Sequence, residues 1–152
     1  MASPSLPKDC MRVIAAIHLL SDKYGATDDT AKILAVMAAA APDRPEIAVA
    51  QARNMLVSRD YAEARSLLDR VETKNPDNAM IKAMLALCMY IQQDGMWETC
   101  AEEALSLSDS NAISRGIIET LAKRSGQPLR GLSQEDASEP VARHHHVPGL
   151  VC

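Results

Sequence analysis

Two prolines, Pro42 and Pro76, lie 34 residues apart, and each ends a run of residues with helical periodicity. The first run reads AKILAVMAAAAP and the second reads AEARSLLDRVETKNP. Proline interrupts a helix that precedes it, yet it fits the first turn of the next helix, where its missing N–H leaves no hydrogen bond unmade. A fixed interval of this length predicts repeated helix pairs that bury their apolar faces by stacking on one another.

An interval of 34 residues is the period of the tetratricopeptide repeat (TPR), which consists of two helices joined by a turn. A unit that begins at Pro45 places small and large side chains where neighbouring helices are expected to meet. The structural repeat positions of this unit are Ala52, Tyr61, Ala64, Leu68 and Pro76. The match is good in the second helix and weaker in the first, where Ala48 and Gln51 occupy the aromatic and leucine positions.

The same register extends in both directions along the chain. One period earlier, residues 11–44 form a unit that closes at a proline. One period later, AMIKAMLALCMYIQQ is followed by GMWETCAEEALSL, and the structural repeat positions continue at Trp97 and Cys100. A last helical pattern spans residues 111–126, with Ser110 as its candidate cap, and would cover the exposed face of the last pair.

The composition favours helices throughout. Hydrophobic residues make up 47% of the chain but aromatic residues only 3%, and Phe is absent, so the core consists of Ala, Leu, Ile, Val and Met. We therefore predict an all-α fold, a TPR-like right-handed superhelix of about three helix pairs plus a C-terminal capping helix. This domain spans residues 8–126, and residues 127–152 are predicted to form a flexible tail, because they lose periodicity and gain Pro, Ser and charge.

Charge and hydropathy exclude several classes of partner. The formal net charge is −4 and no run of Lys or Arg occurs, so we expect no nucleic-acid binding. No stretch approaches the about 18 apolar residues of a membrane span. The run VIAAIHLL contains His18 and lacks a small-residue cleavage site, which favours an amphipathic helix over a signal peptide. Four cysteines are too sparse for a disulfide scaffold, and a reducing, cytoplasmic location fits best.

No catalytic motif is recognisable. The sequence has no Gly-rich phosphate loop, no nucleophile elbow and no paired-His helix motif, so we predict a non-enzymatic protein without cofactor or metal. The run His144-His145-His146 lies in the predicted tail, where no fixed frame would bring ligands together.

Methionines concentrate around the third unit, at Met80, Met84, Met89 and Met96, with Met55 in the helix before. Such side chains commonly fill irregular gaps in a core, and they also form adaptable apolar grooves that bind a partner helix. Both readings stay open. If a groove exists on the inner face of the first helices, its predicted residues are Met55, Met84, Leu85, Cys88 and Met89.

The segment IKAMLALCMYIQQDGMWETCAEEALS resembles the Hrp-type TPR-like accessory protein family of bacterial type III secretion systems. Its most specific element is the turn that carries Trp97 and Cys100. The resemblance implies a non-enzymatic part in building or operating the secretion apparatus. The related needle-subunit chaperones imply a sharper mechanism, in which a concave groove holds an amphipathic helix of the needle subunit and blocks premature polymerisation.

We therefore expect a chaperone or assembly factor that binds an amphipathic helix of a type III secretion component. The alternative is a regulatory TPR module that acts on a different protein partner. A homo-oligomer and a heterodimer are both open. Because Hrp-type members can act at the envelope, an envelope-associated or periplasmic location is the alternative to the cytoplasm.

Overall fold

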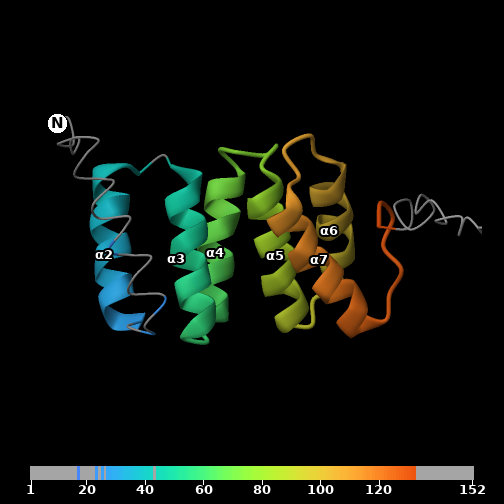
Figure 1. Ribbon diagram of the computed structural model, residues 1–152, viewed down its shortest axis with the longest axis horizontal. Helices are drawn as coiled ribbons and strands as arrows, with labels where there is room; N and C mark the ends of the chain where they lie inside the picture. Colours follow the sequence, from blue (N-terminus) through green and yellow to red (C-terminus); the bar gives the residue numbers. More distant parts are fainter. Residues whose placement is uncertain (1–16, 18–22, 24, 26, 43, 133–152) are drawn as a thin grey trace, which may run out of the picture.

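The protein is all-helical in the part that the computed structural model describes, residues 17, 23, 25, 27–42 and 44–132 (Figure 1). This part contains six helices and no strand, which confirms the predicted all-α class. The helices are α2 (Thr27–Ala40), α3 (Pro45–Val57), α4 (Tyr61–Glu72), α5 (Ala79–Ile91), α6 (Trp97–Ser106) and α7 (Ala112–Ser125). Only residues 17 and 23 of the predicted first helix of the 11–44 unit are described, and both are helical. The histidines at 18 and 144–146 lie outside the described residues.

The helices pack mainly against their neighbours in the chain. They stand side by side along the long axis of the molecule, from α2 at one end to α6 and α7 at the other (Figure 1). Helix α5 contacts α4 and α6, its neighbours in the chain, and also α3 and α7. Stacked helix pairs predict this order of contacts, while the TPR-like superhelix itself stays a prediction.

Local sequence signals fix where α3 and α5 begin. Pro45 occupies the first turn of α3, where no acceptor is needed for a backbone N–H. Asn78 precedes α5, and its side-chain oxygen accepts a hydrogen bond of 3.0 Å from the backbone N–H of Ile81.

Helix α7 is capped at both ends. Asn111, rather than the predicted Ser110, is the N-cap, and it forms a capping box with Ser114. The box holds because the Asn111 side chain accepts from the Ser114 N–H at 3.2 Å, and the Ser114 hydroxyl accepts from the Asn111 N–H at 3.0 Å. Gly126 ends the helix with a φ of 70°, a left-handed conformation that glycine adopts without strain.

The predicted repeat positions within the helices lie at helix contacts, whereas Pro76 does not. Ala52, Ala64 and Leu68 are each 0% exposed and belong to one core cluster formed by α3, α4 and α5. Tyr61 begins α4 and Trp97 begins α6. Trp97 lies 36 residues after Tyr61, because the loop before it carries two residues more than the 34-residue period. Trp97 is buried at 6% exposure and Cys100 is half-buried, whereas Pro76 is exposed in the turn before α5.

Three ionic contacts join neighbouring elements across the stack. The Lys82 ammonium on α5 lies 2.9 Å from the Glu72 carboxylate on α4 and 2.8 Å from that of Glu103 on α6. Burial alone would lower the pKa of Lys82, but its hydrogen bonds to Glu103 and Glu72 raise that pKa above its ordinary value. Arg65 of α4 donates at 2.8 Å to Asp94 in the turn between α5 and α6.

The core extends past the predicted domain boundary. The chain turns after Gly126, and Leu129, which the sequence prediction assigned to the tail, is only 3% exposed in the cluster of α5, α6 and α7. The backbone N–H of Arg130 also donates at 3.0 Å to Glu102 on α6. Residues 133–152 lie outside the described residues, so the rest of the predicted tail stays a prediction.

The 34-residue register makes Ala64 a position where a larger side chain cannot fit. We expect Ala64→Leu to lower the free energy of unfolding by about 1–3 kcal/mol, because extra carbons would overpack a fully buried site. Urea unfolding followed by circular dichroism measures this difference. Ala62→Leu, on the exposed face of the same helix, is the matched control and should leave stability nearly unchanged. Equal midpoints for the two variants would contradict the register.

Candidate protein-binding groove

The structure places most of the predicted groove residues in the interior. Met55, Met84, Leu85 and Cys88 gather in the core cluster of α3, α4 and α5, whereas Met89 packs against the neighbouring cluster of α5, α6 and α7. Exposure is 5% for Met84, 4% for Leu85 and 0% for Cys88. These three side chains lie in the core and do not line an open groove. The prediction that they form a binding surface is therefore corrected.

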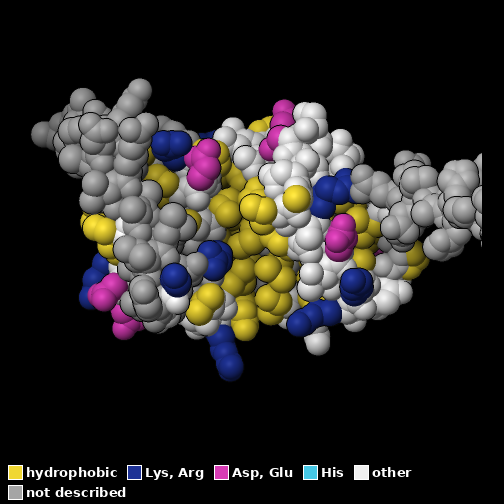
Figure 2. Space-filling view, in the orientation of Figure 1, with side chains coloured by type: hydrophobic (Ala, Val, Ile, Leu, Met, Phe, Trp, Pro, Cys, Tyr) yellow, Lys and Arg dark blue, Asp and Glu magenta, His cyan; other side chains and the backbone are white. Residues whose placement is uncertain are grey.

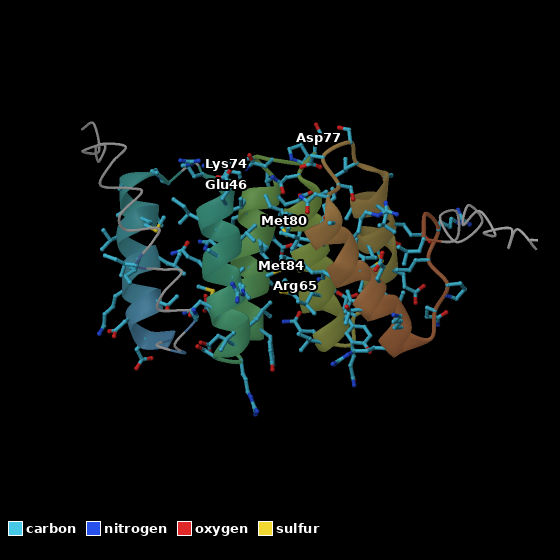
Figure 3. The ribbon with its side chains drawn as sticks, in the orientation of Figure 1. Glu46, Arg65, Lys74, Asp77, Met80 and Met84 are labelled. Atoms are coloured by element: carbon cyan, nitrogen blue, oxygen red, sulfur yellow. The ribbon has the colours of Figure 1, made fainter. Side chains whose placement is uncertain are left out.

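The physical reason is the number of helices that surround α5. Met80 and Met84 lie one turn apart on this helix (Figure 3). Because α5 touches α3, α4, α6 and α7, the face that points away from its pair partner is covered by further helices. The gap-filling reading of methionine therefore describes Met84, while Met55 and Met89 are half-buried.

An open apolar groove lies instead between the C-terminal half of α5 and α7. Figure 1 shows α7 slanting across α5, so the two helices do not stay parallel. The space between them has a volume of about 460 Å³. It is lined by three residues of α5 and seven of α7, namely Leu87, Tyr90, Ile91, Ala112, Ile113, Gly116, Ile117, Thr120, Leu121 and Arg124. We call this space the α5–α7 groove.

The two sides of the α5–α7 groove expose large apolar side chains. Ile113 of α7 is 69% exposed and Ile91 of α5 is 37% exposed. Figure 2 shows hydrophobic side chains gathered over α5 near the centre of this face. Apolar surface that is contiguous and rimmed by polar residues commonly marks a protein interaction site.

Small residues on α7 keep the groove open. Ala112, Gly116 and Thr120 follow one another at intervals of four and therefore share one face of the helix. A glycine inside a helix is about 1 kcal/mol less favourable than alanine. A Cβ added at Gly116 would meet nothing within 4 Å, so the fold itself leaves room for a larger residue. The Thr120 hydroxyl donates to the Gly116 carbonyl at 2.7 Å and so makes its hydrogen bond within α7.

Trp97 supports one wall of the groove from behind. Its indole meets the ring of Tyr90 edge-on, with centroids 5.4 Å apart and planes at 79°. Such pairs stabilise one ring orientation beyond the burial of area. Because Tyr90 lines the groove, its contact with Trp97 links the predicted structural role of Trp97 to the groove wall.

Sequence reasoning missed the contribution of α7, which it treated only as a capping helix. The signal that could have found the groove is the pattern of Ala112, Gly116 and Thr120 beside Ile113 and Ile117. The exposure of Ile113 could not be predicted from the sequence, because the slant of α7 across α5 decides which apolar side chains are covered.

The two described cysteines are buried or half-buried thiols that ionise weakly. Cys88 and Cys100 are free thiols, and burial raises the pKa of each to about 11. The Cys100 thiol donates to the backbone carbonyl of Lys82 at 3.3 Å. Within the described residues, no group of three His, Cys, Asp or Glu side chains could hold a metal ion. None of the six described helices has the length and hydrophobicity needed to cross a bilayer.

Burial makes Met84 a poor place to test binding. We expect Met84→Glu to lower the free energy of unfolding by more than about 3 kcal/mol, because the carboxylate would enter a core without a partner. Chemical denaturation measures the loss. Met96→Glu is the matched control, since Met96 is 60% exposed, and it should unfold like the wild type. A Met84→Glu protein of undiminished stability would show that this side chain faces solvent.

The raised thiol pKa values predict slow modification. At pH 8 a thiol with a pKa of about 11 is roughly 0.1% ionised, and only the thiolate reacts with a disulfide reagent. In a Cys10→Ser, Cys152→Ser background, we expect both remaining thiols to react slowly at pH 8 and faster as the pH rises toward 11. The same protein in urea should react at once, and equally rapid labelling in native buffer would refute the prediction.

Comparison with known proteins agrees with the family that the Trp97 and Cys100 turn suggested. No curated protein and no solved structure matches the chain. A family model described as bacterial type III secretion protein (HrpB1_HrpK) matches residues 1–127, which include all six described helices. The chain therefore belongs to the HrpB1_HrpK family of bacterial type III secretion proteins.

Proposed function

We propose that this protein is a non-enzymatic chaperone or assembly factor that binds an amphipathic helix of a type III secretion component such as the needle subunit. The observation that carries the proposal is the α5–α7 groove, an open apolar surface on a member of a type III secretion family. An amphipathic helix that lays its apolar face in a hydrophobic groove is a common form of peptide recognition.

The proposed scaffold is a TPR-like right-handed superhelix of three helix pairs with α7 as the capping helix. The contacts support it, because α3 packs on α4 and α5 on α6, as the helices of one pair do. The first helices of successive units also touch, α3 on α5 and α5 on α7. In such a stack the first helices form one continuous surface, and the α5–α7 groove lies on it.

We also propose a cytoplasmic location. The free thiols of Cys88 and Cys100 suit a reducing compartment, where the chain could hold a secretion component before its export. A regulatory module that acts on a different partner would use the same kind of surface, and the identity of the bound helix distinguishes the two functions.

The proposal is tested with synthetic peptides that cover the amphipathic helices of the host's type III secretion components. Isothermal titration calorimetry should find a peptide that binds with a negative heat-capacity change and weak salt dependence, because apolar burial drives the association. Binding only to peptides from proteins outside the apparatus would favour the regulatory module, and no binding to any helix would refute the proposal.

The variant Ile113→Asp tests whether the bound helix lies in the α5–α7 groove. We expect about a tenfold or greater loss of affinity, because an exposed apolar contact is replaced by a charge that binding would desolvate. The fold should persist, since Asp in the first turn of α7 suits the helix dipole. Val36→Asp is the matched control, because Val36 is 54% exposed on the distant helix α2 and its replacement should leave affinity unchanged.

A further inference from the structure

Resting on the proposed function, we infer that the α5–α7 groove takes an apolar helix that crosses α7 at Gly116 and carries a carboxylate where it meets Arg124. The inference names the chemistry of the partner rather than its identity. It depends on two features of α7, a glycine that packing within the described residues does not require and an arginine that pairs with no described carboxylate.

Gly116 differs from the other described glycines. Gly25, Gly126 and Gly131 have φ values of 71°, 70° and 93°, which other residues rarely adopt, and Gly95 lies in the turn before α6. Gly116 alone among the described glycines lies inside a regular helix. Glycine is less favourable than alanine in a helix, and a Cβ at this position would meet nothing within 4 Å. Packing within the described chain therefore gives no reason for glycine, while close approach of an external backbone does.

The shape of the groove fits a helix. Its lining on α7 runs from Ala112 to Arg124, a length of about 18 Å along the helix axis. Small side chains at Ala112 and Thr120 flank Gly116 by one turn each, so the floor stays low on both sides of the crossing. Ile113 and Ile91 rise at the edges, and they would pack between the side chains of the bound helix.

Arg124 gives the groove a preference for an acidic residue on the bound helix. Among the described residues it is the one charged residue in the lining of the groove, and Lys123 beside it adds positive charge. None of the ion pairs between described residues includes Arg124. Glu119 of the same helix does not line the groove. An apolar groove with a cation at one end complements an apolar helix with an acidic residue at the corresponding end.

A second copy of this chain fits less well. A two-fold contact through α7 would place one hollow against the same hollow, which leaves the exposed isoleucines poorly packed. The described structure therefore favours a convex helical partner, and self-association is one outcome of the test below.

The test uses two synthetic 18-residue peptides and the full chain. Both have Leu and Ala on one helical face and neutral polar residues on the other. One peptide ends in two Glu residues and the other in two Lys residues, and fluorescence anisotropy gives the affinity of each.

We expect the Glu peptide to bind the wild type about two- to fivefold tighter than the Lys peptide, the effect of one exposed ion pair. Arg124→Glu should reverse this preference. Gly116→Leu should weaken both peptides about tenfold or more by filling the groove, without lowering the melting temperature, because Leu is the better helix former. Ala62→Leu, on α4, is the matched control and should leave both affinities unchanged.

Three results would overturn the inference. They are unchanged binding to Gly116→Leu, a peptide preference that ignores the charge at position 124, and failure of both peptides to bind. The proposed function survives any of these if a secretion-component helix still binds the wild type, because that helix would then use another surface or chemistry. Sedimentation of the wild type as a dimer that Gly116→Leu dissociates would assign the groove to a second copy, and would overturn the inference as well.

Discussion

Burial of α5 is the constraint on which the rest of the structure depends. Seven of its 13 residues are buried, and the helix touches α3, α4, α6 and α7. The two larger core clusters lie on either side of it and share half-buried residues such as Leu87 and Cys100. A displacement of α5 would therefore open both clusters at once, whereas α2 rests on α3 alone among the described helices.

One charged residue lies on this buried helix, and its environment explains how the stack tolerates it. Lys82 keeps 14% of its side chain exposed and reaches carboxylates on both neighbouring helices, Glu72 and Glu103. Removing one partner of such a pair destabilises a protein more than replacing both partners by apolar residues, because the remaining charge stays desolvated and unpaired. The same ammonium thus joins α4 and α6 to α5.

The period of 34 residues was enough to predict the helix pairs and the small buried positions, because Ala52 and Ala64 must be small wherever two helices cross. It could not predict which methionines face a groove. Periodicity gives the face of a helix, but the number of helices that cover that face depends on distant packing. The same limit hid Ile113, whose exposure follows from the slant of α7, while Gly116 was a readable signal that went unused.

Ile113 and Gly116 lie together on α7 although neither adds much to the stability of the free protein. The capped ends of α7 hold the surface that these two residues form. Gly116 lowers the stability of α7 relative to alanine, and Ile113 adds little stability because it stays exposed after folding. The two residues lie within one turn of each other. Meanwhile the capping box at Asn111 and the left-handed Gly126 fix both ends of the helix. A groove whose wall is already rigid loses little conformational entropy when it is filled, so more of the apolar burial appears as affinity. The conformational cost of binding then falls on the partner, which must become helical to fit.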